Sequence, residues 1–270
     1  MPFMDEEHYF EKVAEYKLLA KHEIGQNFLV DIEVAKRIVA SAELQPSDRI
    51  LEIGSGAGSL SYFIDKSGAE SDLIDIDEAL VLKLQDDFKD NPKTHPQIGN
   101  IMRWELRPYS KIIGNLPYYI TSAIVEKILL EASSAELAVL MVQKEVIARL
   151  SAKVGSEDYG PLPILLQFRA SFARVFNVAR TAFSPTPHVD SSVFLLRFKN
   201  GVSLKEAGEL YSFVSQLFLH RRKTILNNLT TVTKDSVAAK ELLFQAGIEP
   251  TRRPEELSLS EFIKLRSQLH

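Results

Sequence analysis

The chain of 270 residues contains no cysteine. Disulfide bonds, thiolate metal sites and cysteine nucleophiles are therefore excluded, and we expect no metal site. Long apolar runs are absent too, because no stretch approaches the about 18 consecutive apolar residues that a membrane helix needs. The first 16 residues are acidic and amphipathic and do not resemble a signal peptide. We therefore expect a cytoplasmic protein without a membrane span.

The net charge of -4 hides an asymmetry along the chain. Residues 1–140 contain 14 Lys and Arg against 24 Asp and Glu, a net charge of -10, whereas residues 141–270 contain 18 against 12, a net charge of +6. An acidic first half suits a cationic small ligand, and a basic second half suits a polyanion. Chance and a solvated surface produce similar asymmetries, so charge alone does not decide the function.

Strand and helix patterns alternate through the first half of the chain. Short apolar runs predict strands that are followed by amphipathic helices, with strands at 49–53, 72–74, 97–99, 111–114 and 137–142 and helices at 32–42, 59–66 and 121–130. This alternation predicts an α/β fold with a parallel, doubly wound sheet. Two alternating segments at 172–179 and 192–198 are further strands and can form an antiparallel pair.

Beyond the linker at 199–201, only helical patterns occur, at 204–219, 226–229, 236–246 and 260–269. We therefore divide the chain into three parts. These are an N-terminal helical extension (1–21), a Rossmann-like domain (22–199) and a small all-α domain (200–270).

A glycine-rich turn, Gly54-Ser55-Gly56-Ala57-Gly58, connects the first predicted strand to its helix. Such a turn lets a ligand approach the backbone closely. Asp75 follows the second strand, 21 positions after Gly54, where nucleotide-binding units place the acid that holds ribose hydroxyls. Either feature alone is weak, but together they favour a ligand that contains a nucleoside.

The pattern argues against a nicotinamide cofactor. The glycines are spaced Gly-x-Gly-x-Gly, not Gly-x-Gly-x-x-Gly, and no Arg follows Asp75 to bind a ribose phosphate. A dehydrogenase would also need a His, Tyr or Lys to handle hydride after the fourth or fifth strand. The chain instead has Asn115-Leu116-Pro117-Tyr118 there. A dehydrogenase therefore remains only as an alternative.

The Asn115 stretch lies at the carboxyl end of a predicted strand, where open α/β sheets bind ligands. The side-chain carbonyl of Asn115 can accept a hydrogen bond from an amine, and Tyr118 offers a flat face on which a base can stack. Pro117 fixes its own φ and biases Leu116 away from helix. The plainer interpretation is an ordinary strand-to-helix loop with Thr121 as the N-cap.

Three other segments allow both a functional and a structural interpretation. Phe183 precedes two prolines that stiffen its loop, so it is either a second stacking ring or a buried residue of a rigid loop. Arg221-Arg222-Lys223 at a helix junction can contact phosphates, although surface solvation is the commoner reason for such a run. Gln26 and Asn27 read locally as turn residues, with Phe28 and Leu29 buried.

Taken together, these segments resemble the ribosomal RNA adenine dimethyltransferases, most closely those of the bacterial small subunit. The similarity covers the chain from about residue 22 to its end and leaves residues 1–20 unexplained. The segments that carry it are 25–29, 51–58, Asn115-Leu116-Pro117-Tyr118, 143–146, Tyr159-Gly160, 183–192 and Arg221-Arg222-Lys223-Thr224.

The resemblance implies S-adenosyl-L-methionine as the methyl donor. It implies two neighbouring adenosines near the 3′ end of 16S rRNA, in the small ribosomal subunit or its precursor, as the acceptors. We expect the protein to be a monomer. The implied cofactor site contains Asn27, Leu29, Gly54, Asp75, Asn100 and Asn115. Asn115 and the carbonyl of Leu116 would accept the two N–H bonds of the adenine amine, and Tyr118 and Phe183 would sandwich the base. The triplet Arg221-Arg222-Lys223 would contact RNA.

The chain departs from the family pattern at two cofactor positions. Asp75 stands where the family usually has Glu, and Asn100 stands where it usually has Asp. We expect weaker cofactor binding at Asn100 because one negative charge is lost there. Two alternatives within related classes stay open, namely a methyltransferase that acts on large-subunit rRNA and a ribosome-assembly factor without turnover.

Overall fold

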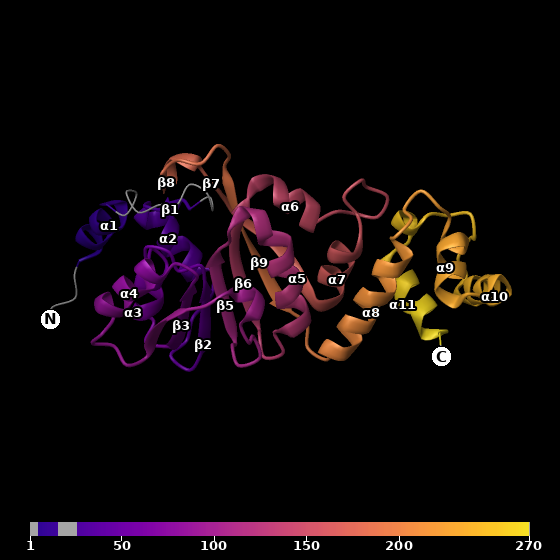
Figure 1. Ribbon diagram of the computed structural model, residues 1–270, viewed down its shortest axis with the longest axis horizontal. Coiled ribbons are helices and arrows are strands. Elements are labelled where there is room, and N and C mark those ends of the chain that lie inside the picture. Colours follow the sequence, from indigo (N-terminus) through magenta and orange to yellow (C-terminus); the bar gives the residue numbers. More distant parts are fainter. Residues whose placement is uncertain (1–4, 16–25, 270) are drawn as a thin grey trace. The chain divides into compact units, whose positions relative to one another are not determined.

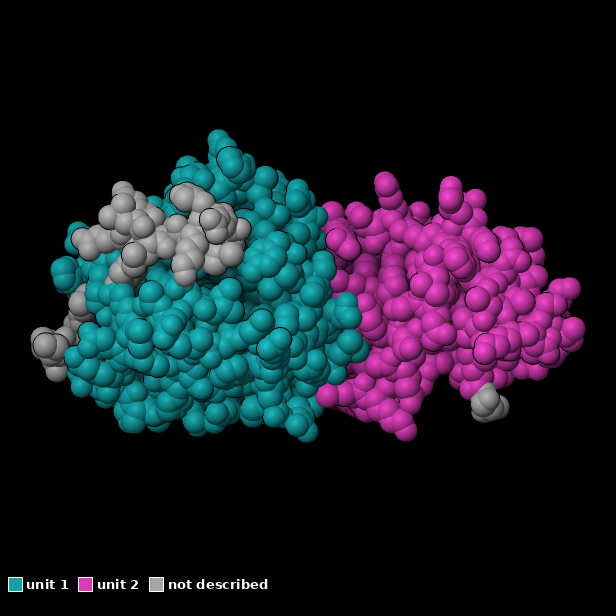
Figure 2. Space-filling view, viewed as in Figure 1, with its two compact units in different colours: residues 1–147, 172–198 teal, residues 148–171, 199–270 magenta. Residues whose placement is uncertain are grey.

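The computed structural model describes residues 5–15 and 26–269, which cluster into two compact units. The first unit comprises Met1–Ile147 and Phe172–Phe198, and the second comprises Ala148–Ser171 and Lys199–His270 (Figure 2). Residues 148–171 therefore group with the C-terminal helices, whereas the sequence had placed them with the sheet. The reason is packing, because Tyr159 and Ile164 are buried in the apolar cluster of the second unit.

A mixed seven-stranded sheet forms the centre of the first unit, with the order β4-β3-β2-β5-β6-β9-β7 in the described part of the chain (Figure 1). The parallel strands are β2 (Arg49–Ile53), β3 (Glu70–Asp75), β4 (Thr94–Ile98), β5 (Lys111–Asn115) and β6 (Leu137–Gln143). These strands confirm the predicted ones to within a few residues. β9 (Ser191–Phe198) runs antiparallel to β6, and β7 (Ala170–Val178) lies at the edge beside β9.

The helices of this unit follow the strands with which they alternate in sequence. They are α2 (Ile32–Ala40), α3 (Ser61–Lys66), α4 (Glu78–Asp87) and α5 (Thr121–Glu131), with the single turns η3 (Ile101–Arg103), η4 (Tyr118–Ile120) and η5 (Arg180–Ala182). Asp31 caps α2 and Asp77 caps α4 through their carboxylates, the role for which Asp is favoured at this position. The next helix, α6 (Lys144–Leu150), begins directly after β6.

The strand order places a switch point between β2 and β5. Within the sheet, β3 and then β4 follow on one side of β2. The later strands β5 and β6 lie on the opposite side of β2. The carboxyl ends of β2 and β5 therefore open a crevice between connections that run in opposite directions, which is where doubly wound sheets bind ligands. The glycine-rich turn follows β2, and Asn115 ends β5.

A second, two-stranded sheet was not predicted from the sequence. β1 (Phe28–Leu29) pairs antiparallel with β8 (Phe183–Ser184), so Phe28 lies opposite Ser184 and Leu29 opposite Phe183. Two-residue strands carry too little periodic signal to detect. The pairing joins segments more than 150 residues apart in sequence, and it fixes the segment that contains Asn27.

The N-terminal helix α1 (Glu6–Glu15) lies within the predicted N-terminal helical extension (1–21), of which residues 1–4 and 16–21 lie outside the described part of the chain. Its apolar side, formed by Tyr9, Phe10 and Val13, is buried in the main core of the first unit. None of the helices in the described residues has the length and apolar character needed to cross a bilayer.

The second unit is built from helices. They are α7 (Pro161–Arg169), α8 (Leu204–Leu217), α9 (Ile225–Thr233), α10 (Ser236–Ala246) and α11 (Leu259–Ser267), with the turn η6 (Pro254–Glu256). Ser203 and Ser258 form capping boxes with the glutamates three positions later, which explains where α8 and α11 begin. Gly247 ends α10 in the left-handed conformation.

Candidate active site

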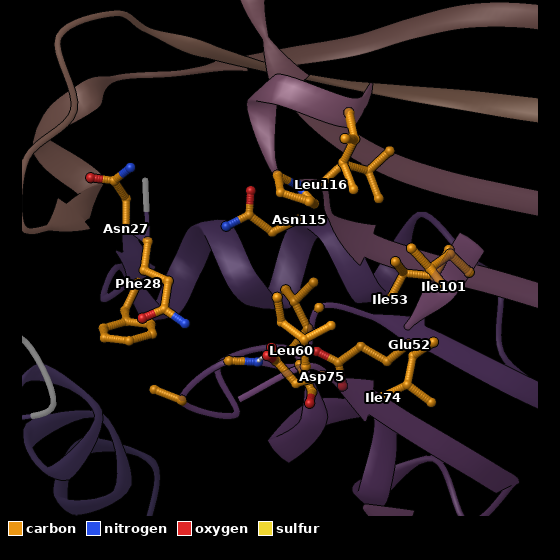
Figure 3. A pocket seen from close by; sticks show the side chains of 18 of the residues that line it. Asn27, Phe28, Glu52, Ile53, Leu60, Ile74, Asp75, Ile101, Asn115 and Leu116 are labelled. Atoms are coloured by element: carbon orange, nitrogen blue, oxygen red, sulfur yellow. Dashed lines mark hydrogen bonds between the residues drawn. The ribbon is translucent and has the colours of Figure 1, made fainter. Parts of the chain in front are cut away.

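A cavity of about 310 Å³ lies at the carboxyl ends of β2, β3 and β5 in the first unit. This volume is at the lower end of the range of small-molecule sites. The residues predicted for the cofactor and the reacting base line it, with one exception discussed below. They are Asn27, Leu29, Gly54, Asp75, Asn100, Asn115, Leu116 and Tyr118. Figure 3 shows the side chains of Asn27, Asp75 and Asn115 around this hollow, each from a different segment.

The glycine-rich turn is held in place by Asp75. One carboxylate oxygen of Asp75 accepts the backbone N–H of Gly56 at 2.9 Å, and the other accepts that of Asp77 at 2.9 Å. Gly54 has a φ of +70°, a conformation that side chains rarely adopt, and a Cβ there would lie 3.4 Å from the Asn115 carbonyl. Burial raises the pKa of Asp75, while the backbone N–H groups act in the opposite direction.

The segment at Asn27 is fixed on two sides. Leu29 lies in β1, and its carbonyl accepts a hydrogen bond from the Ser59 hydroxyl at 2.5 Å. On the other side, the N–H of Val30 donates to the carbonyl of Ala182 at 2.8 Å. Phe28 and Leu29 are buried as predicted. Gln26 and Asn27 both line the cavity, whereas Gly25 lies outside the described residues.

The Asn115 stretch leaves its polar side chain available to a ligand. The N–H of Leu116 donates to the carbonyl of Met141 at 3.0 Å, and Pro117 has φ -63° and ψ 129°. Thr121 is the first residue of α5 and not its cap, and its hydroxyl donates back to the carbonyl of Pro117 at 3.0 Å. Within the described part of the chain, no hydrogen bond engages the side-chain amide of Asn115.

Tyr118 follows directly and also lines the cavity. The ring is half-buried, and its hydroxyl shares a hydrogen bond with the Ser191 hydroxyl at 3.2 Å. Burial raises the pKa of Tyr118, so the phenol stays neutral at physiological pH. A neutral ring with a fixed hydroxyl is a suitable stacking surface for a base.

The prediction of an open stacking face on Phe183 is wrong for this structure. Phe183 is 2% exposed, belongs to the main core of the first unit and does not line the cavity. Its pairing with Leu29 in the two-stranded sheet explains this burial. The alternative interpretation of a rigid loop with a buried Phe is confirmed.

Asn100 caps the turn η3, and this changes what it can offer. Its side-chain oxygen accepts the N–H of Met102 at 2.9 Å, and its amide N–H₂ adds two donors that a ligand can use. β4 ends at Ile98, which agrees with the predicted end of the third strand. An Asp at this position could form the same cap but would offer no donor.

Two polar residues of the cavity were missed by the sequence reasoning. Glu52 is 1% exposed, and the Ser61 hydroxyl donates to its carboxyl group at 2.6 Å. Burial raises the pKa of Glu52 to about 8, so this acid is protonated near neutral pH. The sequence did contain a signal, namely an acid inside the apolar strand Leu51-Glu52-Ile53. Glu is almost never fully buried unless it has a partner.

Ser55 is the second missed residue. Its hydroxyl oxygen is buried and has no hydrogen-bond partner among the described residues. Buried polar atoms are normally paired, so an unpaired one beside a cavity fits a ligand with polar groups. Together with the glycine turn and Asp75, this donor and acceptor set fits a nucleoside-containing cofactor.

The basic triplet lies in the second unit, on the connection between α8 and α9. The buried side-chain amide of Asn228 donates to the carbonyls of His220, Lys223 and Thr224 and so fixes this connection. Arg221 lies over the ring of Phe218 at 5.8 Å. Arg222 and Lys223 are exposed. No group of His, Asp and Glu suited to hold a metal ion occurs among the residues that the structure describes.

Comparison with known proteins assigns the family. The model of a family described as "Ribosomal RNA adenine dimethylase" matches residues 18–269. The chain belongs to the ribosomal RNA adenine dimethylase family.

Relatives of this family with similar sequences cover nearly the whole chain. A protein of Levilactobacillus brevis called "Ribosomal RNA small subunit methyltransferase A" is 36% identical, over 94% of this chain and 92% of its own length. A protein of Bacillus cytotoxicus with the same name is 37% identical, over 95% of this chain and 94% of its own length.

Two solved structures of rRNA or adenosine methyltransferases are similar to this one. A dimethyladenosine transferase from Plasmodium falciparum matches with a TM-score of 0.77 and 25% identity, over 88% of this chain and 95% of that chain. The 23S rRNA methyltransferase ErmE matches with a TM-score of 0.64 and 25% identity, over 88% of this chain and 98% of that chain. The fold is thus the Rossmann-like fold of S-adenosylmethionine-dependent methyltransferases.

Proposed function

We propose that this adenine dimethylase methylates the exocyclic amines of two adjacent adenosines near the 3′ end of 16S rRNA. The acceptor would be the small ribosomal subunit or its precursor, with a role in subunit maturation, and the enzyme would act as a cytoplasmic monomer. The observation that carries the proposal is that the Asn115 stretch, the glycine turn and Asp75 line one cavity. The names of the relatives, which refer to the small subunit, support the choice of RNA.

The residues that would hold S-adenosylmethionine lie on both sides of the switch point. Asp75 would accept hydrogen bonds from ribose hydroxyls, and the N–H₂ group of Asn100 would face the nucleoside. Glu52 and the unpaired hydroxyl of Ser55 would lie near the polar groups of the cofactor. When bound, the cofactor supplies a methyl group that is already activated by its sulfonium.

The chain's own contribution to the chemistry is to orient the adenine amine. Asn115 and the Leu116 carbonyl would accept its two N–H bonds, which favours a tetrahedral nitrogen whose lone pair points at the methyl group. Orientation of this kind contributes on the order of 7–11 kcal/mol in favourable cases. The amine becomes acidic once methylated, so no base is needed beforehand. In agreement, the described residues that line the cavity include neither His nor Lys.

The target adenine must leave its stack in the RNA to reach Asn115, which costs about a few kcal/mol. Stacking on the half-buried ring of Tyr118 would offset part of this cost. The basic triplet of the second unit would bind phosphates, because Arg222 and Lys223 are exposed on a connection that Asn228 fixes.

The test is methyl transfer from radiolabelled S-adenosylmethionine to small-subunit particles and, in a parallel reaction, to large-subunit particles, both lacking adenine methylation, followed by identification of the product nucleosides. Dimethyladenosine in 16S rRNA is the expected result. Label in 23S rRNA instead would favour the large-subunit alternative, to which the similarity with ErmE gives some support. Cofactor binding without transfer to either RNA would favour an assembly factor and direct attention to Asn100.

A further inference from the structure

The helix α1 lies outside the family match, which begins at residue 18, yet three of its side chains are buried in the core of the first unit. Tyr9 and Phe10 are each 4% exposed, and Val13 is 1% exposed. An N-terminal extension that served only as a spacer would not bury its aromatic residues so completely. The helix is therefore an integral part of this core.

Tyr9 connects α1 to the glycine-rich turn beside the cavity. Its ring stacks on Tyr62 with centroids 4.5 Å apart and an interplanar angle of 28°. Its hydroxyl donates a hydrogen bond to the carbonyl of Gly58, the last residue of the glycine-rich turn, at 3.3 Å. A Cβ at Gly58, where φ is +92°, would lie 2.3 Å from the Tyr9 hydroxyl oxygen. The turn and the helix thus fit together without room for any side chain at Gly58.

Ion pairs connect the rest of α1 to three neighbouring helices. Glu6 pairs with Lys36 of α2 at 2.6 Å and with Lys66 of α3 at 3.3 Å. Lys12 pairs with Asp87 at the end of α4. These ion pairs help to fix the orientation of α1 and thereby the position of the Tyr9 hydroxyl beside Gly58.

Hydrogen bonds within the glycine-rich turn connect Gly58 to residues that line the cavity. The N–H of Gly58 donates to the carbonyl of Ser55 at 2.9 Å, and Gly56 is bound by Asp75. Asp75 therefore holds the middle of the turn at Gly56, whereas Tyr9 holds its last residue, Gly58. A binding loop fixed at two points loses less conformational freedom when its ligand binds.

We propose that α1 is a positioning element for the cofactor, and that Tyr9 keeps the glycine-rich turn in its binding conformation before the cofactor arrives. The inference rests on the proposed function, because it takes S-adenosylmethionine as the ligand of this turn. It assigns a role to a segment that the family match does not cover.

The experiment compares Tyr9→Phe with Val13→Ala in the full chain. Tyr9→Phe removes only the hydroxyl and keeps the stacked ring, whereas Val13→Ala weakens the packing of the same helix without touching the turn. Isothermal titration with S-adenosylmethionine gives the Kd, and thermal melting without ligand gives the stability. For Tyr9→Phe we expect a Kd about 3- to 10-fold higher, as the loss of one hydrogen bond implies, and a Tm close to that of the wild type.

Val13→Ala should show the opposite pattern, with a lower Tm and an unchanged Kd. Steady-state kinetics should give Tyr9→Phe a higher KM for the cofactor at unchanged kcat and unchanged KM for RNA. A wild-type Kd for Tyr9→Phe would overturn the proposal. So would a rise in Kd for both variants in proportion to their loss of Tm, because α1 would then only stabilise the fold. A folded wild type that does not bind S-adenosylmethionine would overturn the proposed function first and this inference with it.

Discussion

The two units of the chain differ in charge and in the kind of surface they build. The first contains 18 Lys and Arg against 26 Asp and Glu, a net charge of -8, and it encloses a cavity lined by the buried carboxylate of Asp75. The second contains 14 against 10, a net charge of +4, and it presents an exposed basic connection. An acidic cavity suits a cationic cofactor, whereas phosphates require cations. Separate parts of one chain can therefore serve small-ligand recognition and polyanion recognition.

The strongest test of this division is Asn115→Ala. It removes one of the two acceptors proposed for the adenine amine, so we expect the turnover number to fall by about 100-fold or more, as when one transition-state hydrogen bond is lost. RNA binding, measured by filter retention, should not change. Asn100→Ala in the same cavity is the matched control and should raise the cofactor Kd while nearly preserving kcat. A small effect of Asn115→Ala on kcat would break the assignment.

Tyr118→Ala should be the next largest effect. Losing the stacking ring should reduce turnover about 10- to 100-fold, because stacking contributes roughly 1–3 kcal/mol per base. The cofactor Kd, measured by calorimetry, should stay near the wild-type value. Tyr118→Phe keeps the ring and removes only the hydroxyl that shares a hydrogen bond with Ser191, and it serves as the control. Equal losses of turnover and cofactor affinity in Tyr118→Ala would mean that Tyr118 is structural.

A double replacement in the second unit tests whether the basic triplet binds RNA. Arg221→Ala with Arg222→Ala should weaken RNA binding about 10-fold and lower the slope of log K against log salt by about 1–2, since each phosphate contact contributes close to one unit. The cofactor Kd should not change. Lys234→Ala with Lys240→Ala removes the same charge elsewhere in the second unit and is the control. An unchanged salt slope in the arginine variant would exclude the triplet from the RNA interface.

The smallest expected effect concerns Glu52. It is a change in how the free energy of unfolding depends on pH, not a change in turnover. Burial raises the pKa of this acid from 4.5 to about 8 in the folded state, so between these values the folded chain holds a proton that the unfolded chain has released. The free energy of unfolding should therefore fall as pH rises from 4.5 to 8. Glu52→Gln should lose this part of the decline, which thermal melting at a series of pH values would detect. Parallel wild-type and variant curves would contradict the shifted pKa.

Local patterns predicted the elements that carry a strong periodic signal. β6 is an uninterrupted apolar run, and α10 was predicted with the bounds that the structure has, because its apolar period lies between an Asp cap and a terminal Gly. The glycine turn after β2 and Asn115 at the end of β5 followed from the rule that parallel strands present their carboxyl ends at one edge. These features depend on residues that are close together in sequence, which is why the sequence could predict them.

The misses share one cause, which is dependence on distant partners. β1 and β8 are two residues each and exist only because they pair with each other, and that pairing buries Phe183. Residues 148–171 join the second unit because Tyr159 and Ile164 pack there. Glu52 could have been noticed as an acid in an apolar strand, but its raised pKa depends on the burial around it.

Local sequence patterns specify the order of strands and helices, the glycine turn, the acid at Asp75 and the Asn115 stretch, together with the family to which these features point. Tertiary structure decided which of these groups meet in one cavity, that Asn100 offers its amide N–H₂, and that Tyr9 binds Gly58 across 49 residues. The physical reason is that backbone patterns arise from local sterics and periodic burial, whereas the availability, protonation and orientation of a side chain depend on atoms that only folding brings beside it.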